Sequence, residues 1–83
     1  MQVIITPKAQ KQYEHLPKDE QAKIKKKLLV LESDPLSGKK LAGELKEQRS
    51  FRAWPYRIIY YMNVNEEKIY VTSIIHRQGA YKK

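Results

Sequence analysis

The feature of the sequence that most constrains the fold is a pair of long strand-like segments in its second half. Residues 56–64 and 68–76 are both rich in β-branched and aromatic residues, a composition that favours strands. The polar cluster between them, residues 63–67, is typical of a hairpin turn. A shorter strand is predicted at residues 51–54, before Pro55. Such a chain must build a sheet and cover at least one face of it.

The first half of the chain predicts an opening strand and the two helices that cover one face of this sheet. Residues 3–5 are a β-branched run that indicates an opening strand, and Thr6 is suited to cap a helix that starts at Pro7. Pro17 should end this helix and open a second one, which residues 34–38 stop. The apolar positions at helical spacing are Ala9, Tyr13 and Leu16 in the first helix and Ile24, Leu28 and Leu31 in the second.

This order of elements predicts an α+β fold of one domain, residues 1–83. An N-terminal β-strand and an α-helical hairpin pack on a mostly antiparallel β-sheet, in the order β-α-α-β-β-β. Because side chains alternate along a strand, one face of the 56–64 segment should carry Arg57, Ile59 and Tyr61, and the other Ile58, Tyr60 and Met62.

Charge narrows the range of partners. The chain has 17 Lys+Arg against 9 Asp+Glu, a net charge of +8, which favours a polyanion such as nucleic acid over a neutral partner.

There is no cysteine, and the two histidines lack the spacing of a metal motif, so we expect no metal and no cofactor. No apolar run is long enough to predict a signal peptide or a membrane span, so we expect a cytoplasmic protein that binds no membrane.

Arginines and aromatic residues are interleaved between residues 39 and 57. Basic residues outnumber acidic ones six to two there. Guanidinium groups pair with phosphates and aromatic rings stack on bases, a combination that suits single-stranded RNA. The candidate RNA-binding residues in this stretch are Lys46, Arg49, Arg52 and Trp54. The alternative, with the aromatic rings in the core and the arginines as solvated edges, stays open.

Two segments carry a resemblance to a known family. Residues 52–60, RAWPYRIIY, resemble the R-x-x-x-Y-R-hydrophobic-hydrophobic-Y strand of the RelE/ParE toxins. Residues 75–81, IHRQGAY, resemble the C-terminal hydrophobic-H-R-x-x-x-Y ending of the same superfamily. The opening strand, the helical hairpin and residues 41–45 also fit the family layout, so the resemblance covers nearly the whole chain and implies a RelE-like fold.

The resemblance also implies an activity. RelE-type toxins of type II toxin–antitoxin systems cleave mRNA in the ribosomal A site without a metal, and the ribose 2′-OH attacks its own 3′ phosphate. Arg57 matches the arginine that contacts the scissile phosphate, Arg77 the C-terminal arginine, and Tyr81 the tyrosine that orients the nucleotide. Arg52 matches a basic position in the same groove.

The general acid and base are not identified by the resemblance. RelE-type enzymes carry two lysines before the central arginine, where this chain has Gln48 and Ser50. His76 is a candidate catalytic residue because histidine is the most frequent general acid or base in enzymes, and a structural role for it is the alternative. Two other functions stay open: a ParE-like protein that poisons DNA gyrase by binding, and a degenerate, non-toxic relative that only binds an antitoxin.

The family also implies the partners. These are a cognate antitoxin, the ribosome and mRNA, with operator DNA bound only indirectly through the antitoxin. A small basic domain suits an acidic, partly disordered segment that wraps around it. We expect that segment to lie near the helices and either to displace the Tyr81 region or to cover the groove at Arg57.

Overall fold

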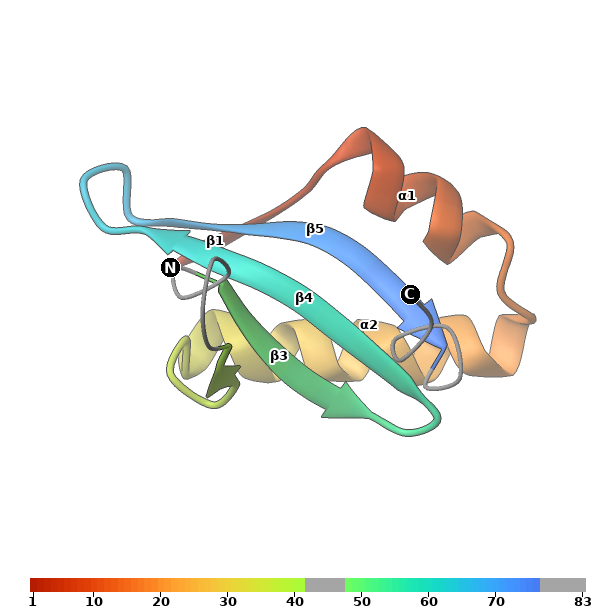
Figure 1. Ribbon diagram of the computed structural model, residues 1–83. Coiled ribbons are helices and arrows are strands. Elements are labelled where there is room, and N and C mark those ends of the chain that lie inside the picture. The colour runs from red at the N-terminus through yellow and green to blue at the C-terminus, as the bar shows by residue number, and fades with distance from the viewer. Residues whose placement is uncertain (42–47, 77–83) are drawn as a thin grey trace.

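The computed structural model describes residues 1–41 and 48–76, which form two helices and a five-stranded sheet (Figure 1). In chain order the elements are β1 (Gln2–Ile5), α1 (Pro7–Glu14), α2 (Lys18–Ser33), β2 (Lys39–Lys40), β3 (Gln48–Ala53), β4 (Tyr56–Asn63) and β5 (Lys68–His76). The strands lie in the order β1-β5-β4-β3-β2. Only β1 and β5 are parallel, and the other pairs are antiparallel.

The predicted architecture is confirmed, with two differences in the strands. β3 begins at Gln48, three residues before the predicted start at Phe51, and ends at Ala53. The two-residue strand β2 was not predicted, because two consecutive lysines carry no strand pattern. Their pairing with β3 is visible only in three dimensions, where Lys39 lies opposite Ser50 and Lys40 opposite Arg49.

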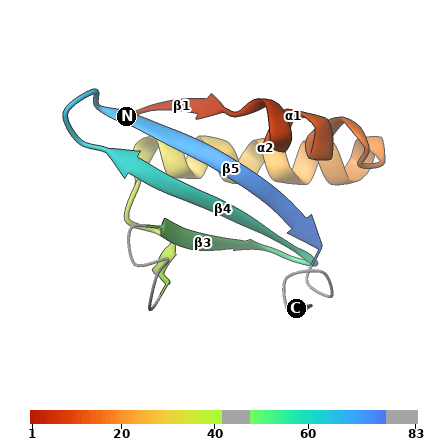
Figure 2. The same ribbon diagram turned by 45° about the horizontal axis from the view of Figure 1, so that its top comes forward.

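Local chemistry sets the ends of the helices. Thr6 caps α1 by accepting a hydrogen bond from Ala9 N at 3.5 Å, and Pro7 takes a first-turn position, where its missing N–H costs nothing. Pro17 separates the helices, and Asp19 and Glu20 stand in the first turn of α2, where the helix dipole favours acidic residues. Both helices lie on the same side of the sheet (Figure 2), and α2 runs behind the strands in Figure 1.

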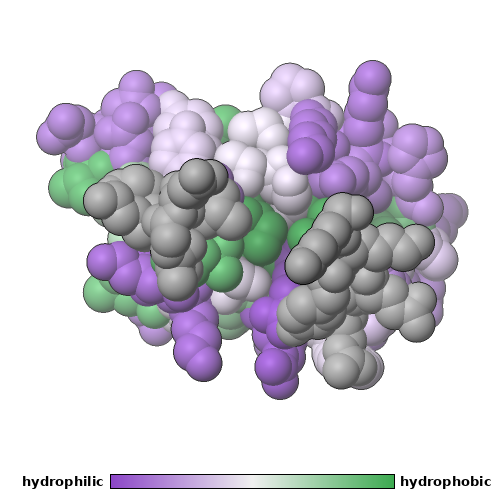
Figure 3. Space-filling model, in the orientation of Figure 1, coloured by the Kyte–Doolittle hydropathy of each residue, from purple (hydrophilic) through white to green (hydrophobic). Residues whose placement is uncertain are grey.

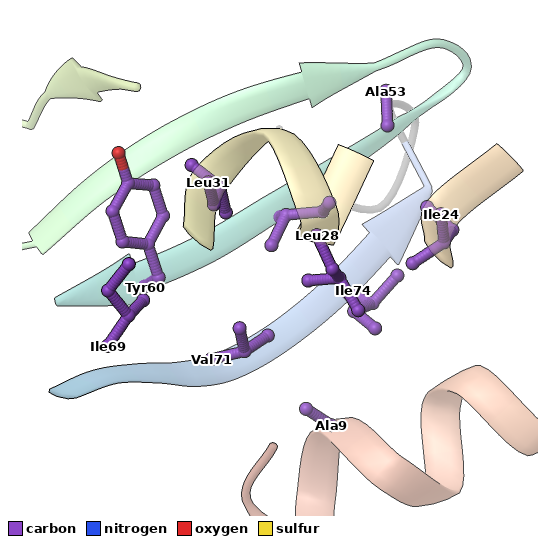
Figure 4. Packing of buried hydrophobic residues seen from close by; sticks show 10 residues of the cluster. Ala9, Ile24, Leu28, Leu31, Ala53, Tyr60, Ile69, Val71 and Ile74 are labelled. Atoms are coloured by element: carbon purple, nitrogen blue, oxygen red, sulfur yellow. The ribbon is translucent and has the colours of Figure 1, made fainter. Parts of the chain in front are cut away.

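The core lies between this helical layer and one face of the sheet. In Figure 4, Leu28 and Leu31 of α2 point toward Tyr60, Val71 and Ile74 of the sheet. The fully buried side chains with the largest volumes are Tyr60, Ile24, Leu31, Ile58, Ile69 and Val71. Neither α1 nor α2 lies over the opposite face of the sheet, which is the face that Figure 1 shows.

A β-bulge changes which side chains of β5 face the core. The register between β4 and β5 shifts at Ile59/Tyr60, so that Ile59 pairs with Ser73 and Tyr60 with Val71, leaving Thr72 unpaired in the ladder. Val71 and Ile74 are therefore both buried, although they are three residues apart. β1 ends opposite Val71, and beyond that point α1 covers the strand edge, where the Gln12 side chain accepts a hydrogen bond from Ile74 N at 2.7 Å.

Tyr60 anchors the segment between α2 and β2 to the sheet. Its hydroxyl donates to Pro35 O at 2.7 Å and accepts from Gly38 N at 2.9 Å. Arg49, directly opposite Tyr60 on β3, donates from Nη1 to Gly38 O at 2.9 Å. A Cβ at Gly38 would lie 2.6 Å from Tyr60 Cε1 and 2.9 Å from Cζ, so the position requires glycine because of this close approach.

Removing the Tyr60 hydroxyl should destabilise the fold. Tyr60→Phe keeps the ring but leaves Gly38 N and Pro35 O without their partner, and such a loss costs about 1–3 kcal/mol. Urea denaturation would measure the loss in free energy of unfolding. Tyr61→Phe, one residue along on the other face, is the matched control and should change it by less than about 0.5 kcal/mol. Equal stability of the two variants would contradict the anchoring role.

Stability should fall at alkaline pH in a way that depends on Tyr60. Burial raises the pKa of Tyr60 above its ordinary value of 10.0. The contribution of the neutral phenol to folding is therefore complete below that value and is lost as pH rises through the folded-state pKa, because only the unfolded chain ionises readily. The hydrogen bond to Glu66 raises the pKa of Tyr70 as well. Urea denaturation of wild type, Tyr60→Phe and Tyr70→Phe between about pH 8 and 11 would separate the two. An unchanged alkaline slope in Tyr60→Phe would contradict this assignment.

Candidate functional site

The face of the sheet away from the helices carries the candidate site. On β3 and β4, three directly opposed pairs share this face: Arg52 with Arg57, Ser50 with Ile59, and Gln48 with Tyr61. The predicted alternation along β4 is confirmed in its central part, because Ile58 and Tyr60 are buried in the core while Arg57 and Ile59 are half-buried. Figure 3 shows this face, with strongly hydrophilic side chains around a paler and partly hydrophobic centre.

A cavity of about 340 Å³ opens on this face beside the arginine pair. Its lining residues are Ser37, Lys39, Ser50, Phe51, Arg52 and Arg57. Three of the six are basic and none is acidic, so the electrostatic potential of the cavity favours an anion. Two guanidinium groups offer planar forks that match the oxygens of a phosphate.

The Arg52–Arg57 pair is unfavourable for the fold taken alone. Like charges directly opposite on neighbouring strands destabilise a sheet, and these two arginines are cross-strand partners next to the hairpin turn. Arg52 is exposed and Arg57 is half-buried. An anionic group between the two guanidinium groups would offset their mutual repulsion.

Ser50 is the one buried polar residue in the described part of the chain, with 6% of its surface exposed. Within that part, its Oγ has no hydrogen-bond partner. Buried hydroxyl groups are nearly always paired, so this one calls for an explanation. Ser50 also lies in the lining of the cavity, where a ligand that displaced the cover of its oxygen would supply the missing partner.

Arg49, predicted to bind RNA, lies on the opposite side of β3 from the cavity. It is the cross-strand partner of the core residue Tyr60, and its guanidinium donates to Gly38 O. Its position one residue before Ser50 turns it toward the helical layer. Arg49 is therefore not among the residues that the structure brings together around Arg57.

Trp54 lies in the two-residue turn between β3 and β4, where the peptide bond to Pro55 is cis. Its side chain is 56% exposed, and its carbonyl accepts a hydrogen bond from Lys23 Nζ of α2 at 3.2 Å. The indole is exposed, but it does not line the cavity.

His76 ends β5 on the same face as the core. It pairs with Tyr56, whose ring it meets edge-on with centroids 5.3 Å apart, whereas Arg57 pairs with Ile75. The β-bulge changes which side chains of β5 face the core, and it places His76 on the side of the sheet opposite to Arg57. Lys46, Arg77 and Tyr81 lie outside the described residues.

The structure adds Lys39 and Ser50 to the predicted basic site. Their residue types carry no signal of their own, and only the pairing of β2 with β3 reveals them. Tyr61 and Tyr70 were also missed as a pair: they stack on the open face with centroids 5.2 Å apart and an interplanar angle of 21°. The described residues hold no group of three or more His, Asp or Glu side chains that could bind a metal. No helix in the same part of the chain is long and apolar enough to cross a membrane.

Comparison with protein families gives one match over almost the full length. Residues 3–81 match the model of the ParE toxin of the type II toxin–antitoxin system parDE. Among curated proteins, no sequence matches the chain.

Solved structures of toxins share the fold. A chain of the toxin–antitoxin complex RelBE2 from Mycobacterium tuberculosis is 27% identical, with a TM-score of 0.85 over 92% of this chain and 96% of that one. The isolated RelE toxin of E. coli is 20% identical, with a TM-score of 0.77 over 90% and 82% of the two chains. A chain of the RelE–RelB complex from Pyrococcus horikoshii is 23% identical, with a TM-score of 0.75 over 92% and 93%.

The two neighbouring arginines of β3 should respond differently to truncation. Arg49→Ala removes a charged hydrogen bond to Gly38 O, which contributes about 1.5–3 kcal/mol. Arg52→Ala removes an exposed side chain and one member of a like-charge pair, so stability should stay within about 0.5 kcal/mol of wild type or rise. Thermal and urea denaturation would measure both. A greater loss of stability in Arg52→Ala than in Arg49→Ala would refute the assignment of Arg49 to the fold.

Proposed function

Because the chain belongs to the ParE toxin family of type II toxin–antitoxin systems, within the RelE/ParE superfamily, we propose that it is a toxin that cleaves mRNA on the translating ribosome. The observation that carries this proposal is the Arg52–Arg57 pair in the lining of a cavity whose described residues include no acidic side chain. This is a site for a phosphodiester, and it lies on the strand that carries the family motif.

The proposed reaction is an internal transfer within the RNA. The ribose 2′-hydroxyl gives up its proton to a base, and its oxygen forms a bond to the adjacent 3′ phosphorus. The bond from that phosphorus to the 5′-oxygen breaks, and the leaving oxygen takes up a proton. The products are a 2′,3′-cyclic phosphate and a free 5′-OH. The guanidinium groups of Arg57 and Arg52 stabilise the extra negative charge of the pentavalent transition state, so no metal is required. Arg77 and Tyr81 are proposed to complete the site, as the family motif implies.

The rest of the open face suits a single strand of RNA. Beyond the arginines, Ile59 and the stacked Tyr61 and Tyr70 continue along the same surface. Aromatic and aliphatic side chains of this kind stack on unpaired bases regardless of sequence. The arginines would then hold the phosphates while the tyrosine pair supports the bases.

We propose a cognate antitoxin as the regulatory partner, acting in the cytoplasm together with the ribosome. Similar solved structures include toxin–antitoxin complexes, among them the YoeB–YefM complex from Staphylococcus aureus. Leu29 and Val30 of α2 and Leu36 after it are 60%, 42% and 62% exposed, which offers apolar anchors for an antitoxin segment near the helices. Operator DNA would be bound through the antitoxin.

A ParE-like gyrase poison is the second candidate. Two observations favour it: the matching family model is that of the ParE toxin, and the β3 positions where RelE-type enzymes carry lysines hold Gln48 and Ser50. Such a protein would act by binding, and its basic face would not need to cut RNA.

Primer extension on an mRNA that is being translated would test the nuclease. Wild type should produce new 5′ ends within codons, and Arg57→Ala and Arg52→Ala should each lower the cleavage rate by about 10²–10³-fold, because each removes a donor to the transition state. Lys26→Ala, an exposed lysine of α2, is the control and should cleave like wild type.

Two results would contradict this mechanism. Unchanged cleavage in both arginine variants would exclude transition-state stabilisation by this pair. Absence of cleavage by wild type, together with gyrase-dependent DNA breaks in the same cells, would select the ParE-like function.

A further inference from the structure

We infer that Lys39 and Ser50 form a second phosphate-binding subsite, next to the one at Arg52 and Arg57. The inference rests on the proposed RNA substrate. Lys39 lies outside the family motif, and Ser50 stands where RelE-type enzymes carry a lysine, so the inference gives this position a role in the present chain. Lys39 is exposed and lies directly opposite Ser50, in the lining of the same cavity as the two arginines.

The chemistry of the pair fits an anionic oxygen. The lysine ammonium is a compact charge with three donors on a flexible stem, and opposed side chains in an antiparallel pair start only about 4.5–5.5 Å apart. The Ser50 hydroxyl is 6% exposed and has no hydrogen-bond partner among the described residues. A phosphate oxygen in the cavity would accept from the Lys39 ammonium, and a small shift that uncovers the Ser50 oxygen would let the same phosphate accept from the hydroxyl as well.

Spacing indicates that the two subsites take neighbouring phosphates. Ser50 precedes Arg52 by two residues on β3, with both side chains on the open face. Two residues along a strand span about 7 Å, comparable with the separation of consecutive phosphates in an extended RNA strand. A strand that places one phosphate on the arginine pair would therefore bring the next one over Ser50.

The start of β2 is held firmly enough to position Lys39. The preceding residue, Gly38, is fixed on both of its peptide groups: its N–H donates to the Tyr60 hydroxyl and its carbonyl accepts from Arg49. Lys40 follows on the same short strand but pairs with Arg49, so it faces the opposite side. Lys39 and Lys40 thus have the same residue type and exposure and differ in the face that they occupy.

Binding of a short 2′-O-methyl oligoribonucleotide to the full chain tests the subsite. This probe cannot be cleaved, because the attacking hydroxyl is blocked. Its dissociation constant would be measured against salt concentration for wild type, Lys39→Ala, Lys40→Ala and Ser50→Ala. Lys39→Ala should lose one phosphate contact, so the plot of log association constant against log salt concentration should become less steep by about 0.7. Lys40→Ala should keep the wild-type slope and affinity.

Ser50→Ala separates binding from folding. It should bind the probe more weakly while keeping or exceeding the wild-type melting temperature, because the hydroxyl that it removes has no partner within the described part of the protein. A lower melting temperature with unchanged binding would overturn the role of Ser50.

The outcomes also separate this subsite from the proposed nuclease. Equal slopes for Lys39→Ala and Lys40→Ala, or no binding by wild type, would overturn the subsite whatever the cleavage assay shows. Binding that depends on Lys39 in a protein that leaves translated mRNA intact would support the subsite and refute the nuclease.

Discussion

The hydrogen bonds on the two sides of Gly38 are the constraint on which the candidate site depends. Tyr60 and Arg49 are directly opposed on β4 and β3, and each holds one peptide group of the same glycine. Because Tyr60 is fully buried, its hydroxyl must be paired, and it is paired with the segment that leads into β2. The core thereby fixes a surface strand that would otherwise be only two residues of exposed lysine.

The pleat of β3 separates the structural arginine from the candidate functional one. Arg49 points toward the core side and supports the fold, while Ser50 and Arg52 point to the open face and line the cavity. Residue type alone does not distinguish Arg49 from Arg52, since both are arginines within one basic stretch. Their roles differ because the side-chain period of a strand is two, so neighbouring residues face opposite sides of the sheet.

Much of this arrangement could be predicted from the sequence. The hairpin, the two helices and the facing of Arg57 follow from local periodicity and from proline positions, which act over a few residues. The pairing of Lys39 with Ser50 could not be predicted, because β2 has no β-branched residue and its partner lies eleven positions away. The contact of Arg49 with Gly38 could not be predicted either, because it depends on the path of the chain from α2 back to the sheet.

The bulge at Ile59/Tyr60 bears most directly on the chemistry. Its extra residue, Thr72, reverses which side chains of the second half of β5 face the core. Ile75 therefore pairs with Arg57 on the open face, and His76 pairs with Tyr56 on the other face. No sequence pattern marks it, since the residues around it, apart from Ser73, are good strand formers. With His76 across the sheet and Gln48 and Ser50 in place of lysines, the described residues that line the cavity offer cations and hydroxyl groups but no carboxylate or imidazole. For the proposed RNA cleavage, these residues therefore favour electrostatic stabilisation of phosphate. A group that removes the 2′-OH proton would have to come from elsewhere in the chain or from the ribosome.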